Sequence, residues 1–155
     1  QSLFKNLNSI IRFQTLFLGL SVIVFTRTVT SIFDLDLIKK TLIAIFLFLP
    51  TIKYYNNLLT EPLCSALSLL FVSFIIKLIF NFNIQNLFWS SVLILLLLLS
   101  RNQFIFLYPL ILITYIGIYI VNTSKKTLVL LISSFLLILT IHNSLIVLNK
   151  HFNKD

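Results

Sequence analysis

The chain has 155 residues, of which 59% are hydrophobic and 10% are charged. Soluble globular domains carry about 25% charged residues, so this composition excludes an ordinary soluble domain and is typical of a helical membrane protein. The net charge of +8 does not indicate nucleic-acid binding, because the basic residues stand singly or in pairs between apolar runs and form no basic stripe with interleaved aromatics.

Six apolar segments approach the length of about 20 residues that a helix needs to cross a bilayer. Backbone polar groups in lipid must be satisfied within the segment, so we expect these segments to be helices. The short connections between them leave no room for a soluble domain. We therefore predict an all-α, polytopic transmembrane helical bundle of about six spans, forming one integral membrane domain over residues 1–155. The predicted spans are 13–33, 41–58, 63–82, 84–100, 103–121 and 127–148.

Glu61 is the only glutamate of the chain and the only acidic residue between Asp36 and Asp155. If all six segments span the membrane, Glu61 and Arg101 lie on the same face, because two spans separate them. Asp34 and Asp36 then lie on the opposite face. The basic residues divide six against six between the two faces, so the positive-inside rule does not fix the orientation.

Two interpretations of Glu61 stay open. Thr60, Glu61 and Pro62 form a good helix start, in which Thr60 is the N-cap and the carboxylate lies in the first turn. Alternatively, an ionisable residue at membrane depth often marks a substrate or ion pathway. Donors and aromatic rings that suit a sugar, and equally a membrane interface, precede it in the sequence. These candidate substrate-lining residues are Lys53, Tyr54, Tyr55 and Asn57.

Three other sites allow a structural and a functional interpretation. Arg101 is either an interfacial anchor or a cation for a lipid phosphate, whose oxygens fit a guanidinium fork. The Asp34-Leu35-Asp36 stretch resembles a metal-binding pair, but two carboxylates alone are a weak signal and we favour a solvated loop. For His142 we favour a packed or interfacial side chain, because no carboxylate is near it in the sequence.

A family pattern is visible in two stretches, "FLPTIKYYNNLLTEPLCSALSLLFVSF" and "LILLLLLSRNQFIFLYPLILI". Together they resemble the GT-C superfamily of polyprenyl-phosphate-sugar-dependent glycosyltransferases, and most closely the dolichyl-phosphate-mannose-protein mannosyltransferase type. Glu61 matches the acidic position that opens a helix, and Arg101 matches the basic position between two later spans. Pro50 and Pro109 match two prolines of the pattern. The resemblance covers about residues 40–115.

The resemblance implies a transferase that takes a sugar from a polyprenyl- or dolichyl-phosphate carrier on the extracytoplasmic face of a membrane. Glu61 would hold a divalent metal or position the acceptor hydroxyl, and Arg101 would bind the lipid phosphate. The membrane would be the bacterial inner membrane, or the endoplasmic reticulum in a eukaryote.

The principal catalytic acid of such enzymes lies in a loop after the first span, and no matching acidic pair precedes Arg12. The chain also begins with Gln1 and contains no Met. We therefore expect a fragment that lacks the N-terminal span, the catalytic loop and any C-terminal soluble domain. The alternatives are a small non-enzymatic subunit or assembly factor of a membrane complex, or a transporter fragment.

Overall fold

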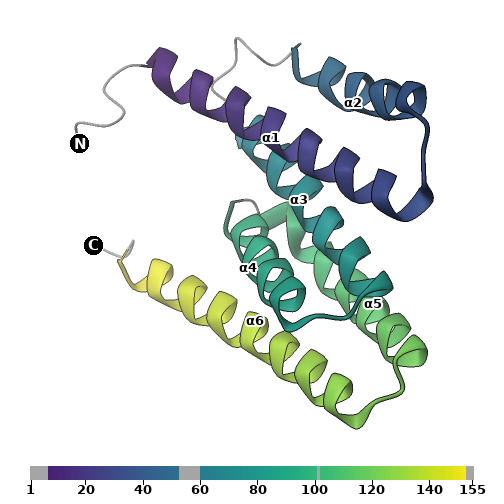
Figure 1. Ribbon diagram of the computed structural model, residues 1–155. Helices are drawn as coiled ribbons and strands as arrows, with labels where there is room; N and C mark the ends of the chain where they lie inside the picture. Colours follow the sequence, from purple (N-terminus) through teal and green to yellow (C-terminus); the bar gives the residue numbers. More distant parts are fainter. Residues whose placement is uncertain (1–6, 53–59, 101, 153–155) are drawn as a thin grey trace. The chain divides into compact units, whose positions relative to one another are not determined.

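The computed structural model describes residues 7–52, 60–100 and 102–152, and these residues are helical apart from short turns (Figure 1). No β-strand occurs in these ranges, so the predicted all-α class is confirmed. The helices are α1 (Leu7–Phe33), α2 (Leu37–Ile52), α3 (Thr60–Phe80), α4 (Ile84–Ser100), α5 (Leu107–Val121) and α6 (Lys125–Phe152), and a 3₁₀ helix, η1 (Asn102–Phe106), separates α4 from α5.

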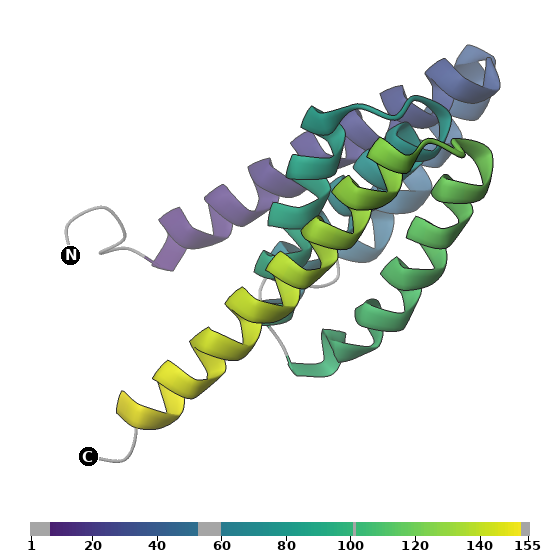
Figure 2. The ribbon, with the colours of Figure 1, turned by 90° about the horizontal axis from the view of Figure 1, so that it is seen from below.

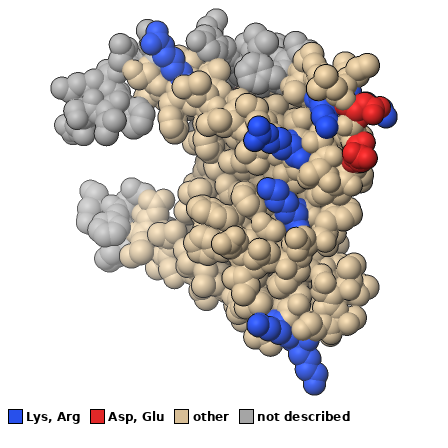
Figure 3. All heavy atoms as spheres, in the orientation of Figure 1, with Lys and Arg blue, Asp and Glu red and all other residues tan. Residues whose placement is uncertain are grey.

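Four stretches of helix are long and apolar enough to cross a membrane: Ser9–Phe33, Glu61–Phe80, Phe104–Val121 and Lys125–Asn149. The helices α4 and α2 are shorter, with 17 and 16 residues. At a rise of 1.5 Å per residue they reach about 25 Å, slightly less than the roughly 30 Å of a hydrocarbon core. On the face drawn in Figure 3, charged side chains are few against a broad uncharged surface, as expected for a protein surrounded by lipid.

The chain divides into two compact units, Gln1–Ile76 and Lys77–Asp155. In the N-terminal unit, α1 packs against α2 through a turn at residues 34–36. Asp34 has a positive φ of 46°, the left-handed conformation that often ends a helix. The carbonyl of Asp36 accepts the backbone N–H of Lys40 at 3.0 Å, so Asp36 begins α2 as its N-cap.

In the C-terminal unit, polar turn residues begin and end the helices. Asn83 caps α4, because its side-chain Oδ1 accepts the backbone N–H of Gln85 at 3.1 Å. The backbone N–H of Asn122 donates to the carbonyl of Ile118 at 2.9 Å and ends α5, and the carbonyl of Ser124 accepts the N–H of Leu128 at 3.1 Å and begins α6. This short turn makes α5 and α6 an antiparallel hairpin, which Figure 2 shows side by side.

The helices α4 and α6 also pack against each other. The core of the C-terminal unit therefore consists mainly of the inward faces of three helices, and most of its buried side chains are aliphatic. The most deeply buried aliphatic side chains of these helices are Ile94, Leu97 and Leu98 from α4, Ile111 and Ile118 from α5, and Leu131 and Ile138 from α6.

Candidate functional site

Of the site residues predicted from the sequence, Glu61 is described by the structure. It lies in the first turn of α3 and is partly exposed. Lys77 lies in the last turn of the same helix. A negative charge at the start of a helix and a positive charge at its end both interact favourably with the helix dipole. Each such charge typically stabilises a helix by about 0.3–1 kcal/mol. Glu61 thus lies in a first helical turn, as the helix-start interpretation expects, but α3 begins at Thr60, so Thr60 is the first residue of the helix rather than its N-cap.

The other predicted site residues lie outside the described part of the chain. The association of Glu61 with the polar segment before it, and with Arg101, therefore stays a prediction. The residues concerned are Lys53, Tyr54, Tyr55, Asn57 and Arg101.

The aspartates of the α1–α2 turn behave as a solvated loop. Both are exposed, and Asp36 pairs with Lys39 at 3.5 Å. Across residues 7–52, 60–100 and 102–152, no group of three His, Cys, Asp or Glu side chains could hold a metal ion. A hard divalent cation needs six or more oxygen ligands or the phosphates of a substrate.

A layer of hydroxyl groups joins the three helices of the C-terminal unit. The Oγ atoms of Ser91 on α4 and Ser134 on α6 are 2.7 Å apart, and the hydroxyl of Tyr115 on α5 lies 3.1 Å from Ser134 Oγ. Ser91 also donates to the carbonyl of Leu87 at 2.7 Å, one helical turn earlier. We call Ser91, Ser134 and Tyr115 the hydroxyl layer.

A second polar contact links α5 and α6 near the start of α5. The hydroxyl of Tyr108 lies 2.5 Å from Nδ1 of His142, and His142 is only 5% exposed. The Tyr108 ring also meets Phe135 edge-to-face, with ring centroids 6.3 Å apart. Because α5 and α6 are antiparallel, this pair and the hydroxyl layer occupy successive levels of one hairpin, eight residues apart on α6. That separation is about 12 Å along the helix axis.

Apolar side chains close the space between these two levels. Ile111 on α5 is 1% exposed and Ile138 on α6 is 0% exposed. Both lie on the helix faces that carry the polar groups, because they are spaced three or four residues from them. Buried aliphatic side chains therefore separate the two polar contacts.

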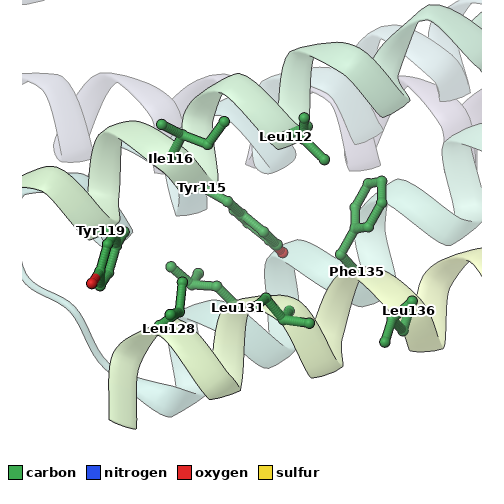
Figure 4. Close-up of a pocket in the computed structure, with 9 residues that line it drawn as sticks. Leu112, Tyr115, Ile116, Tyr119, Leu128, Leu131, Phe135 and Leu136 are labelled. Atoms are coloured by element: carbon green, nitrogen blue, oxygen red, sulfur yellow. The ribbon is translucent and has the colours of Figure 1, made fainter. Parts of the chain in front are cut away.

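Two apolar grooves flank α6. The groove between α5 and α6 has a volume of about 290 Å³, and in Figure 4 Tyr115 reaches across it from α5 towards α6, with Tyr119 and Phe135 on either side. The groove between α4 and α6 has a volume of about 370 Å³, and Ser91, Ser133 and Ser134 are among its lining residues. Both grooves are lined mostly by apolar side chains, which can contact the hydrocarbon chains of membrane lipids.

Sequence reasoning missed both polar contacts. Their partners are 34 and 43 residues apart in the sequence, so a search for neighbouring polar residues does not find them. A signal was nevertheless present, because Tyr108 and Tyr115 are seven residues apart on α5, and Ser134 and His142 are eight residues apart on α6. In an antiparallel hairpin these spacings bring each tyrosine level with its partner.

No protein-family model, curated protein or solved structure matches the chain significantly. Function is therefore inferred from the residues of the chain and from the family resemblance of two of its segments.

Proposed function

We propose that the chain is the membrane core of a glycosyltransferase that moves a sugar from a lipid-phosphate carrier to an acceptor on the extracytoplasmic face. The observation that carries the proposal is the position of Glu61. It is the single glutamate of the sequence, and it opens a helix that is long and apolar enough to span a membrane. The family pattern also has an acidic residue where the corresponding helix begins.

The bounds of the later helices also agree with the pattern. Arg101 follows the last residue of α4, and the apolar stretch Phe104–Val121, which contains Pro109, begins three residues after it. A basic residue between two apolar helices is suited to the phosphate of a membrane-bound carrier, because a guanidinium makes charge-assisted, bidentate hydrogen bonds to phosphate oxygens.

The two residues would have different tasks in transfer. When the bond between the sugar and the phosphate breaks, negative charge develops on the leaving phosphate, and the Arg101 guanidinium would stabilise it. The Glu61 carboxylate would accept a hydrogen bond from the acceptor hydroxyl and orient it. The principal base is expected in the acidic loop that the family carries after its first span.

The test is sugar transfer by the full-length protein in membrane vesicles, with radiolabelled polyprenyl-phosphate sugars as donors. Glu61→Gln and Arg101→Ala should each lower transfer by about a hundredfold, as measured for single groups that stabilise a transition state. Thr140→Ala, at an exposed threonine of α6 that lines neither groove, is the matched control and should leave transfer unchanged. Membrane insertion should be normal in all three variants. Full activity in both Glu61→Gln and Arg101→Ala would contradict the proposal.

A non-enzymatic subunit of a membrane complex is the second candidate, because the helix-start geometry of Glu61 explains this residue without any ligand. In that case Glu61→Gln would change the stability of the protein slightly, and no lipid-linked sugar would be consumed. A transporter is disfavoured, because the sequence has two glycines and no glycine-interrupted pair of helices of the kind that marks transporter sites.

A further inference from the structure

The groove between α5 and α6 is a feature that the proposed transfer chemistry does not use. On the α6 side it is lined by Leu128, Ile132 and Leu136, which follow one another at intervals of four residues and so form one strip along the helix. Tyr115 and Tyr119 line it from α5, and in Figure 4 Tyr119 lies at the end of the groove where α6 begins. An apolar strip that follows the helix axis fits an extended hydrocarbon chain.

The groove occupies one half of the membrane thickness. The apolar stretch of α6 begins at Lys125, and the lining residues Leu128 and Leu136 come 3 and 11 residues later. They therefore lie about 5 and 17 Å along the helix axis from its start. Half of a hydrocarbon core is about 15 Å thick. The groove thus begins near one membrane face and ends near the midplane, which is the depth that a phospholipid acyl chain occupies.

A basic residue lies at the shallow end of the groove. Lys125 and Lys126 open α6, and both are exposed. Lys125 precedes the strip of Leu128, Ile132 and Leu136 by 3, 7 and 11 residues, a spacing that places all four residues on one helix face. Lys126 is rotated by a further 100° or so and belongs to the adjoining face. Lys125 is therefore the lysine on the groove side of the helix.

The positive charge at this end is not compensated by acidic residues of the same unit. A lysine in the first turn of a helix interacts unfavourably with the helix dipole. The sequence has no acidic residue between Glu61 and Asp155. The ion pair found among the described residues joins Asp36 to Lys39 and belongs to the N-terminal unit. A bound anion would stabilise the start of α6, and anionic headgroups are the anions present at a membrane surface.

We propose that the α5–α6 groove binds an acyl chain of an anionic diacyl phospholipid, and that Lys125 binds the phosphate of its headgroup. The ammonium group at the membrane face and the apolar strip below it match the two parts of such a lipid, in the order in which a bilayer presents them. The pair of ammonium and phosphate is charge-assisted, whereas the acyl chain contributes apolar contact.

This lipid site is separate from the proposed transfer site. Arg101 precedes the apolar stretch Phe104–Val121, and Lys125 follows it. If this stretch spans the membrane, the two residues lie at opposite faces. The bound phospholipid then belongs to the leaflet opposite to the face of sugar transfer, and its binding does not require transfer activity.

The test is the quenching of tryptophan fluorescence by phospholipids with dibrominated acyl chains, with the whole chain in phosphatidylcholine vesicles. Trp89 lines neither groove, so Trp89→Phe removes the natural signal with little effect on the site. In this background Ile116→Trp reports on the groove. Ile113→Trp, on the exposed surface of α5 outside the groove lining, is the matched reporter.

We expect the reporter at residue 116 to show a preference for dibromophosphatidylglycerol over dibromophosphatidylcholine of about fivefold, the effect of one lysine near a membrane surface. The reporter at residue 113 should show a preference below about twofold. A second pair, Tyr119→Trp and Ile120→Trp, gives the same comparison if tryptophan at residue 116 fills the groove, because Tyr119 lines the groove and Ile120 is exposed outside it.

Two lysine variants test the headgroup contact. Lys125→Gln should lower the preference at the groove reporter from about fivefold to below about twofold. Lys126→Gln removes the same charge from the adjoining face and should retain most of the preference. Circular dichroism checks that each variant is folded.

An equal preference at the groove reporter and the surface reporter, or equal losses in Lys125→Gln and Lys126→Gln, would show general attraction to the membrane surface and would overturn the site. Displacement of the brominated lipid by geranylgeranyl phosphate more readily than by unlabelled phosphatidylglycerol would assign the groove to an isoprenoid chain and would overturn the phospholipid. None of these outcomes bears on sugar transfer, which the Glu61 and Arg101 variants test separately.

Discussion

Removal of the Ser134 hydroxyl tests the packing of the C-terminal unit most sharply, because this hydroxyl contacts both Ser91 and Tyr115. Hydrogen bonds between membrane helices contribute about 0.6 kcal/mol each on average, so the two lost bonds account for about 1.2 kcal/mol. Tyr115 is 7% exposed, and a buried hydroxyl left without a partner costs a further 1–3 kcal/mol or so. Ser90 and Ser91 also interact with the Tyr115 hydroxyl and would compensate in part. We therefore expect Ser134→Ala to lower the free energy of unfolding by about 1–2 kcal/mol.

The assay is reversible unfolding in mixed micelles at increasing dodecyl sulfate, followed by the fluorescence of the single tryptophan, Trp89. Ser133→Ala is the matched control. Ser133 is exposed, and its hydroxyl donates to Leu130 of its own helix at 3.0 Å, so this change should cost less than about 0.5 kcal/mol. In a double-mutant cycle, Ser134→Ala and Tyr115→Phe should show a coupling energy of about 0.5–1.5 kcal/mol. Equal stability of Ser134→Ala and Ser133→Ala would refute the reasoning.

Three further predictions concern stability and use the same unfolding assay. Ile138→Ala leaves a cavity at a fully buried position and should lower the free energy of unfolding by about 2–4 kcal/mol. Leu137→Ala, at a position that is 52% exposed, should lower it by less than about 1 kcal/mol. Equal losses for the two variants would contradict the burial of Ile138 in the core. Residue 34 has a positive φ, which glycine adopts easily and valine does not. Asp34→Gly should therefore be neutral or stabilise the protein by up to about 1 kcal/mol, and Asp34→Val should destabilise it by about 1–2 kcal/mol. Unchanged stability of Asp34→Val would contradict that conformation. Asp36→Asn removes the ion pair with Lys39, whose side chains are 77% (Asp36) and 62% (Lys39) exposed. It should change stability by less than about 1 kcal/mol, because exposed ion pairs contribute little and asparagine is also a good N-cap. A larger loss would contradict a solvated turn.

Helix positions could be predicted well from the apolar pattern, because lipid demands continuous hydrophobic helices. The predicted span 84–100 coincides with α4, whose start is fixed by the Asn83 cap. The helices extend beyond the predicted spans where polar residues continue them. The first helix begins at Leu7, before the span predicted from residue 13, and the last begins at Lys125, before the span predicted from residue 127. A hydropathy criterion ends at polar residues, whereas the hydrogen-bond pattern of a helix continues through them.

The predicted span 103–121 agrees with the apolar stretch Phe104–Val121. The helix changes type near the start of this stretch, because residues 102–106 form the 3₁₀ helix η1 and α5 starts at Leu107. Pro109 explains this break in part, because proline is tolerated in the first turn of an α-helix, where its missing N–H has no partner. Hydropathy cannot distinguish the two kinds of helix.

Contacts between helices could not be predicted from the sequence, because they depend on the rotation of each helix about its axis. His142 was interpreted from its neighbours along the chain, and its actual partner is Tyr108 on the preceding helix. The choice of Glu61 could be made from the sequence because a single carboxylate stands out in an apolar chain. Its role could not, because a helix start and a binding site use the same residue in the same place.

A shared site requires Glu61 and Arg101 to lie on the same face of the membrane, and cysteine labelling measures this directly. In a Cys64→Ala background, which contains no other cysteine, Glu61→Cys, Arg101→Cys, Asp36→Cys and Lys125→Cys are treated with a membrane-impermeant maleimide in sealed vesicles. We expect residues 61 and 101 to react from one side of the membrane, and residues 36 and 125 to react only from the other. Labelling of residues 61 and 101 from opposite sides would show that α3 and α4 do not both cross the bilayer, and it would contradict a shared site for the two residues.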